Sequence, residues 1–70
     1  MPWSKRNKTT WDYKNGDISG YIVLVKFNNG KTEYQGRAMN DKNRKVGPAV
    51  AASTLTACKN KLQASAKKIR

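Results

Sequence analysis

Apolar and polar residues alternate in the middle of this 70-residue chain, which predicts β-strands. Residues 20–27 read Gly-Tyr-Ile-Val-Leu-Val-Lys-Phe and are rich in the β-branched and aromatic residues that favour strands. Asn29-Gly30 follows them, and Asn-Gly is the strongest short signal for a hairpin turn. The sequence therefore predicts a β-hairpin that turns at these two residues.

A two-residue turn at Asn29-Gly30 would also fix the register of the hairpin. It places Val25 opposite Tyr34 and makes an opposite-charge pair of Lys26 and Glu33. One face is then expected to belong to the core, and it collects Tyr21, Val23, Val25, Phe27, Tyr34 and Ala38. The other face is expected to be polar, and it collects Ile22, Leu24, Lys26, Glu33, Gln35 and Arg37.

Further strand and helix signals flank this hairpin. Residues 9–14 alternate aromatic and polar side chains and precede a turn signal at residues 15–17, so we expect a third strand. Pro48 suits a helix start, and from Ala49 onward apolar residues recur at helical steps. These apolar residues are Ala51, Leu55, Cys58, Leu62 and Ile69. The expected fold class is α+β, a three-stranded antiparallel meander packed against one C-terminal amphipathic helix.

Charge divides the chain into three parts. All four acids, Asp12, Asp17, Glu33 and Asp41, lie within residues 9–41, where four cations balance them. Residues 1–8 carry three cations, and residues 42–70 carry eight cations and no acid, which together give the formal net charge of +11. We expect residues 1–8 to form a basic flexible arm and residues 9–70 to form a single small α+β domain. This distribution is typical of a protein that presents positive charge to a polyanion.

The chain lacks the residues that most catalytic and metal sites need. It has no histidine, four scattered acids and one cysteine, Cys58, which excludes an internal disulfide and a zinc site built from Cys and His. The helical spacing predicts a buried thiol at Cys58. We therefore expect no enzymatic activity and no cofactor. The sequence shows no membrane-spanning run or signal peptide, so we expect a cytoplasmic protein, in the host cell if a phage encodes it.

Nucleic-acid binding is the leading hypothesis, with DNA favoured over RNA. The basic residues before the predicted helix and along the margins of its apolar stripe are expected to contact phosphates, because lysines at a margin extend outwards. They are Lys42, Arg44, Lys45, Lys59, Lys61, Lys67 and Lys68. The alternative is a solvated helix whose last lysines favour the helix dipole.

The polar face of the hairpin is a second candidate surface. Gln35, Arg37 and Lys26 are candidates to read bases as a β-ribbon in a groove, while an ordinary solvated sheet face is the alternative. Ile22 and Leu24 on this expected open face suggest a cover, from a protein partner, a second copy of the chain or Trp3.

Trp3 admits two interpretations. It stacks on bases from a flexible arm, or it packs against its own domain, which we prefer because tryptophan buries much apolar surface.

Two families resemble parts of residues 9–66. Residues 31–36, Lys-Thr-Glu-Tyr-Gln-Gly, with residues 43–45 and an alanine-rich helix, are similar to the second half of a double-stranded-RNA-binding domain. That resemblance implies that Arg44 and Lys45 grip phosphates. A meander followed by one helix resembles the arm-type DNA-binding domains of tyrosine integrases and the plant AP2 domain, whose sheet enters the major groove. That resemblance implies that Gln35 and Arg37 read bases.

The hypothesis is thus a small non-enzymatic protein that binds duplex DNA, of the type found as accessory factors in phages and mobile elements. The alternative is a phage-type interaction module that binds and inhibits a host protein through Ile22, Leu24 and the basic residues around them.

Overall fold

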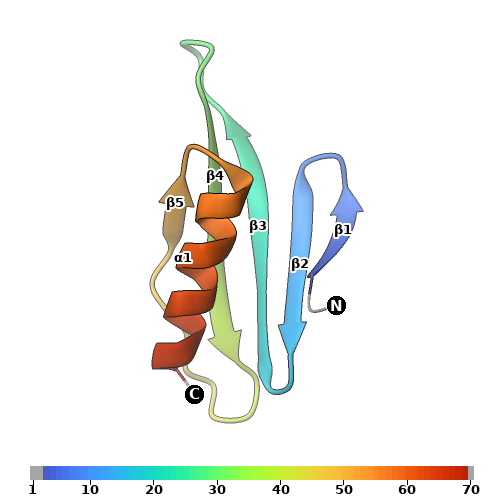
Figure 1. The fold of residues 1–70 in the computed structure, drawn as a ribbon, viewed down its shortest axis with the longest axis vertical. Helices are drawn as coiled ribbons and strands as arrows, with labels where there is room; N and C mark the ends of the chain where they lie inside the picture. Colours follow the sequence, from blue (N-terminus) through green and yellow to red (C-terminus); the bar gives the residue numbers. More distant parts are fainter. Residues whose placement is uncertain (1–2, 70) are drawn as a thin grey trace.

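The computed structural model describes residues 3–69, so that Met1, Pro2 and Arg70 lie outside the described residues. Within them the chain forms one antiparallel sheet and one helix. The elements are β1 (Trp3–Asn7), β2 (Thr10–Asn15), β3 (Ile18–Lys26), β4 (Thr32–Asn40), β5 (Val50–Ala52) and α1 (Leu55–Lys68). Each strand pairs with the next, and α1 packs over β3, β4 and β5 (Figure 1). We call the covered side of the sheet the helix face and the other side the open face.

The predicted three-stranded meander is wrong, because the sheet has five strands, although the fold is α+β. Residues 3–7, which were expected in an arm, form the edge strand β1. Trp3 lies opposite Tyr13, and Arg6 forms an ion pair of 2.7 Å with Asp12. The basic composition of this segment concealed a strand whose aromatic residue packs against the next strand.

The second additional strand is β5, in a segment that was expected to begin the helix. Val50 and Ala52 lie opposite Gly36 and Tyr34 of β4. Alanine favours helices, but here pairing with a sheet edge overrides that preference. The helix begins at Leu55, after Thr54 as its N-cap.

The β3–β4 hairpin is shifted by one residue from the predicted register. Val25, and not Lys26, lies opposite Glu33. Because side chains alternate along a strand, this slip moves each side chain of β3 to the face opposite the predicted one. The side chains of β4 keep their predicted faces. Ile22 and Leu24 therefore lie on the helix face.

The slip arises in the turn, which has three residues between its flanking pair and not two. The N–H of Phe27 donates to the carbonyl oxygen of Lys31 at 2.8 Å. The N–H of Gly30 donates to the carbonyl oxygen of Phe27 at 3.1 Å. Gly30 has φ +85°, a left-handed conformation. A type I turn followed by a left-handed residue is a common hairpin connection, and it uses the same Asn-Gly signal as a two-residue turn.

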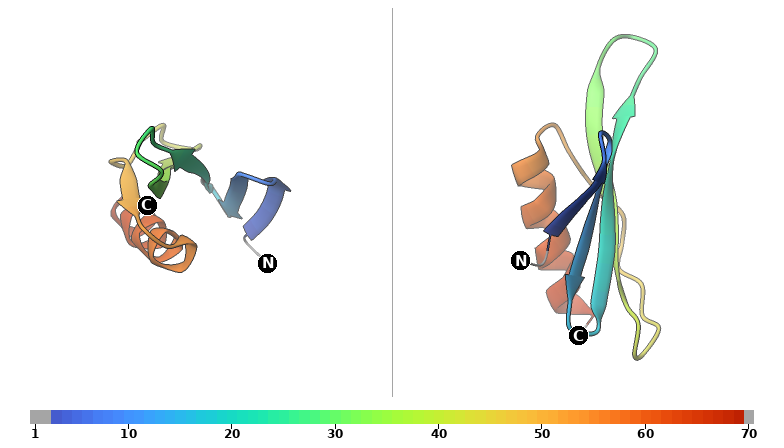
Figure 2. Two further views of the ribbon diagram at one scale, coloured as in Figure 1. Left: turned by 90° about the horizontal axis from the view of Figure 1, so that it is seen from above. Right: turned by 90° about the vertical axis from the view of Figure 1, so that its right-hand side faces the viewer.

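The core lies between α1 and the helix face of the sheet (Figure 2). Its buried members are Tyr13, Ile18, Ile22, Ala38, Ala52, Cys58, Leu62, Ala66 and Ile69. Gly36 lets the helix approach this closely. A Cβ atom there would lie 2.4 Å from the carbonyl oxygen of Tyr21 and 3.2 Å from Cδ1 of Leu62, so the position excludes a side chain.

Candidate nucleic-acid interface

Cys58 is confirmed as a buried thiol. It is fully buried, and its Sγ donates to the carbonyl oxygen of Tyr34 at 3.4 Å. Burial raises the pKa of the thiol above its ordinary value, which lowers the thiolate fraction that a nucleophile needs. Within residues 3–69 no group of three or more His, Cys, Asp or Glu residues is placed to hold a metal ion. None of the helical residues described forms a segment long and apolar enough to cross a membrane.

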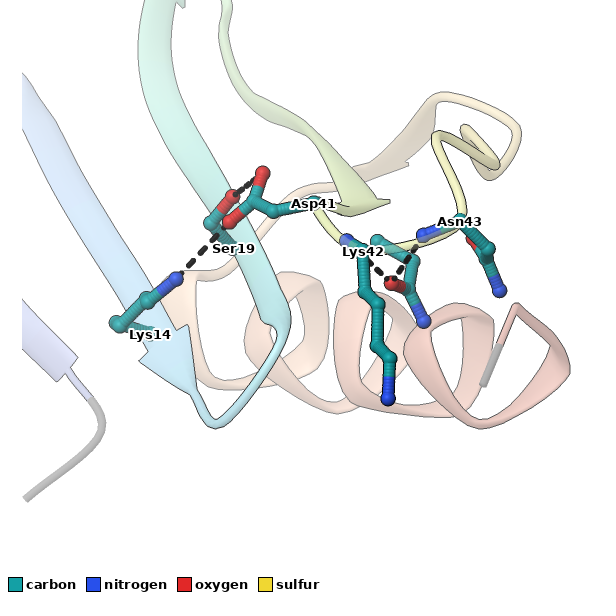
Figure 3. A network of polar contacts seen from close by, with 6 residues as sticks. Lys14, Ser19, Asp41, Lys42 and Asn43 are labelled. Carbon is teal, nitrogen blue, oxygen red and sulfur yellow. Dashed lines mark hydrogen bonds and ion pairs between the residues drawn. The ribbon is translucent and has the colours of Figure 1, made fainter.

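The loop between β4 and β5 is folded around a buried asparagine, Asn40, which is 7% exposed. Its Oδ1 accepts from the N–H groups of Lys42 at 2.9 Å and Asn43 at 3.2 Å (Figure 3). Its own N–H donates to the carbonyl oxygen of Lys45 at 2.7 Å. Its Nδ2 donates to the carbonyl oxygen of Ile69, the C-cap of α1, at 2.9 Å. Asn40 therefore shapes the loop and fastens it to the end of the helix.

This arrangement brings loop and helix cations to the same end of the molecule (Figure 1). We call this group the basic end, and it consists of Lys42, Arg44, Lys45, Lys67 and Lys68, all exposed. Arg44 has φ 61°, in the left-handed region that non-glycine residues seldom adopt. The Oδ1 of Asn43 accepts from the N–H of Lys45 at 2.9 Å, which closes the same turn. The loop thus presents its cations from a hydrogen-bonded backbone.

Asp41 follows Asn40, and its carboxylate is engaged with β2 and β3. Lys14 donates to Oδ2 at 2.9 Å and Ser19 to Oδ1 at 3.0 Å, as Figure 3 shows. The hydrogen bond from Lys14, with that from Ser19, lowers the pKa of Asp41 below 3.8. The loop cations form no ion pair with this acid in the described part of the chain.

Replacing Asp41 with asparagine is expected to lower the stability of the fold at neutral pH by a small amount, because the ion pair is half exposed. The folded-state pKa lies below 3.8, so the contribution of Asp41 is present above that pH and disappears as the pH falls through the folded pKa. Urea midpoints at neutral pH and about pH 3 measure the difference between wild type and Asp41→Asn. Lys14→Met should show the same loss, and a difference that does not shrink as the pH falls would contradict this.

The predicted helical lysines fall into two groups. The Nζ of Lys59 lies 5.1 Å from the ring centroid of Trp3, and that of Lys61 donates to the carbonyl oxygen of Ala51 at 2.9 Å. These two lysines connect α1 to opposite margins of the sheet. Lys67 and Lys68 lie exposed in the last turn and form no ion pair with described residues. They are the helical cations available to a ligand.

Trp3 packs within its own domain, which was the preferred interpretation. Its ring centroid lies 4.8 Å from that of Tyr13, and Lys59 covers it from α1.

The base-reading candidates do not share one face. Gln35 and Arg37 are exposed on the open face, and Arg37 lies opposite Tyr21, which is 41% exposed. Lys26 instead lies on the helix face, because the register slip exchanges the two faces of β3. The open face contains two hollows of about 550 and 260 Å³, both lined by Tyr21 and Val23.

Ile22 and Leu24, expected to contact a partner, belong to the helix face. Ile22 is fully buried and Leu24 is half-buried. The expectation failed because it depended on the register of β3. The apolar residues that replace them on the exposed side include Tyr21 and Phe27, at 41% and 44% exposure.

Sequence reasoning missed Asn40, which organises the basic end. Asn-Asp pairs are typical of turns in which the side chain bonds to the backbone, so Asn40-Asp41 carried a local signal. The burial of Asn40 against Ile69 depends on where the helix ends, which no local pattern records.

The exposed chemistry of the basic end is cationic and well suited to phosphate oxygens. Comparisons with models of protein families, with curated proteins and with solved structures found no match to this chain. The function of the chain is therefore inferred from its own surface.

Proposed function

We propose that this chain is a small non-enzymatic nucleic-acid-binding protein that contacts the phosphates of duplex DNA through its basic end. The observation that supports this is the joining of loop and helix by Asn40, whose Nδ2 donates to the carbonyl oxygen of Ile69. Five exposed cations from two segments are thereby held at one end of the molecule. Lysine and arginine contacts to phosphates supply nearly all of the affinity with which proteins bind nucleic acid non-specifically, because phosphates are the same in every nucleic-acid sequence.

The open face favours DNA over RNA as the ligand. Arg37 and Gln35 extend from β4 of the β3–β4 hairpin, and β4 leads directly into the loop of the basic end. The major groove of B-form DNA admits a two-stranded β-ribbon, and arginine and glutamine are side chains that read base edges there. The major groove of A-form RNA is too deep and narrow for such reading. Arg37 and Gln35 are accordingly proposed as the residues that set sequence preference.

Titration of a labelled DNA duplex, and of an RNA duplex of equal length, is expected to show salt-sensitive binding with DNA preferred. Five phosphate contacts predict that log K falls with log salt with a slope of about −4.5 for B-DNA. Fluorescence anisotropy between about 50 and 200 mM salt measures that slope. The absence of binding, or affinity that salt leaves unchanged, would contradict the proposal, and tighter binding to the RNA duplex would contradict its DNA preference.

A further inference from the structure

The tip of the β3–β4 hairpin, residues 26–32, projects beyond the helix and the other strands (Figures 1 and 2). It lies at the opposite end of the long axis from the basic end, in a molecule of 39 × 21 × 17 Å. Its turn is fixed by two backbone hydrogen bonds and by the Oδ1 of Asn29, which accepts from the N–H of Lys31 at 3.0 Å. The tip is therefore a defined structure that holds its side chains in place.

Phe27 is exposed on this tip. Its side chain is 44% exposed and stands apart from the buried cluster beneath α1. Alternation along β3 places it on the same side as Tyr21 and Val25, the open face. An aromatic residue at a solvated turn contributes little to the core, and its exposure leaves the ring accessible to a ligand.

The charge around Phe27 identifies the kind of ligand. Lys31 lies opposite Phe27 across the turn, and residues 26–32 contain two lysines, two asparagines and no acid. Cations beside an apolar wedge are the arrangement with which proteins hold phosphates while a side chain enters a base step. An acidic protein surface would satisfy the lysines but supplies no stacked planar groups for the ring to separate.

The length of β4 suits one duplex that reaches both ends of the molecule. Its nine residues span about 30 Å at the rise of a β-strand, and Arg37 lies between the tip and the basic end. One helical turn of DNA is about 34 Å long, so contacts at the two ends fall about one turn apart.

We infer that Phe27 inserts between adjacent base pairs of duplex DNA, while Lys31 holds a flanking phosphate, and that the duplex bends at this step. The inference rests on the proposed function, since it requires that the basic end binds DNA. Side-chain wedges of this kind kink DNA by about 20–90°.

The test compares an intact DNA duplex with one that carries a short single-strand gap at its centre, each labelled at both ends for energy transfer. Wild-type protein is expected to bring the ends of the intact duplex closer together. It should also prefer the gapped duplex by roughly tenfold, because the gap has already removed the stacking that Phe27 must break. Phe27→Ala should lose both the bending and the preference, while Phe27→Leu keeps part of each.

Val46→Ala is the matched control, because Val46 is also an exposed apolar residue, at 56% exposure, but lies away from the tip. It should bend and discriminate as the wild type does. The inference is overturned if the wild type binds without bending the duplex. It is also overturned if Phe27→Ala bends and discriminates as well as the wild type, and contact with a protein is then the remaining role for Phe27. Failure of the proposed function has a different result, since wild-type protein would then show no salt-sensitive binding to either duplex.

Discussion

Replacing Lys42 and Lys45 together with glutamate is expected to weaken binding to duplex DNA roughly 100-fold at low salt. Both side chains are exposed, and the loop bonds at these positions use only backbone N–H and carbonyl groups, which the substitutions keep. The salt slope should become less steep by about two, one for each phosphate contact removed. Anisotropy titrations of the double variant against wild type measure both quantities.

The matched control reverses Lys5 and Lys8 instead. These exposed residues lie in β1 and in the turn after it, and their reversal changes the net charge by the same amount. Binding should weaken only a few-fold, through the long-range field of the whole protein. Equal losses in the two double variants would show that net charge, and not the basic end, carries the binding. Urea midpoints of both variants establish that each remains folded.

Ile22→Ala is expected to lower the free energy of unfolding by about 2–5 kcal/mol. Ile22 of β3 is fully buried beneath α1, so truncation of its side chain leaves a cavity under the helix. Chains of this length have a total stability of about 4–10 kcal/mol, so much of the protein should be unfolded or close to it. Urea denaturation followed by circular dichroism measures the change.

Phe27→Ala is the control for Ile22→Ala, because the predicted and observed registers reverse the roles of these two residues. In the observed register Phe27 is exposed, and its truncation should change the free energy of unfolding by less than about 0.5 kcal/mol. A large loss in Phe27→Ala with a small one in Ile22→Ala would support the two-residue turn and contradict the placement of Ile22 on the helix face.

The main periodic elements were predictable from sequence. The alternation before Asn29 indicated the hairpin, and the spacing of Cys58 and Leu62 indicated the helix that covers it. The register was not predictable, because residues 28–30 suit either a two-residue or a three-residue turn with glycine in a left-handed conformation. Ile22 joins the buried cluster that contains Leu62 in the observed register, and membership of that cluster is invisible to local patterns.

The edge strands were missed for a different reason. Residues 50–52 favour a helix when considered alone, and residues 3–7 are too basic to suggest a strand. Each becomes a strand by pairing with a neighbour that the chain places beside it, β4 in one case and β2 in the other. Such pairing is a tertiary effect, and propensity over short segments does not report it.

The candidate site was predictable in composition but not in grouping. Lys59 and Lys67 look equivalent along the helix sequence, yet Lys59 lies over the Trp3 ring and Lys67 is exposed at the helix end. The difference depends on β1, a strand that the sequence did not predict. The loop cations depend similarly on Asn40, which fastens them to the helix end.

The most direct test of the basic end is an amide chemical-shift titration of the labelled protein with a short DNA duplex. The largest shifts are expected at residues 40–45 and 67–69, which form the loop and the helix end, and they should decline as salt is added. Amides of residues 5–8 should move little. A spectrum that DNA leaves unchanged, or shifts that avoid the basic end and fall on residues 5–8, would contradict the proposed interface.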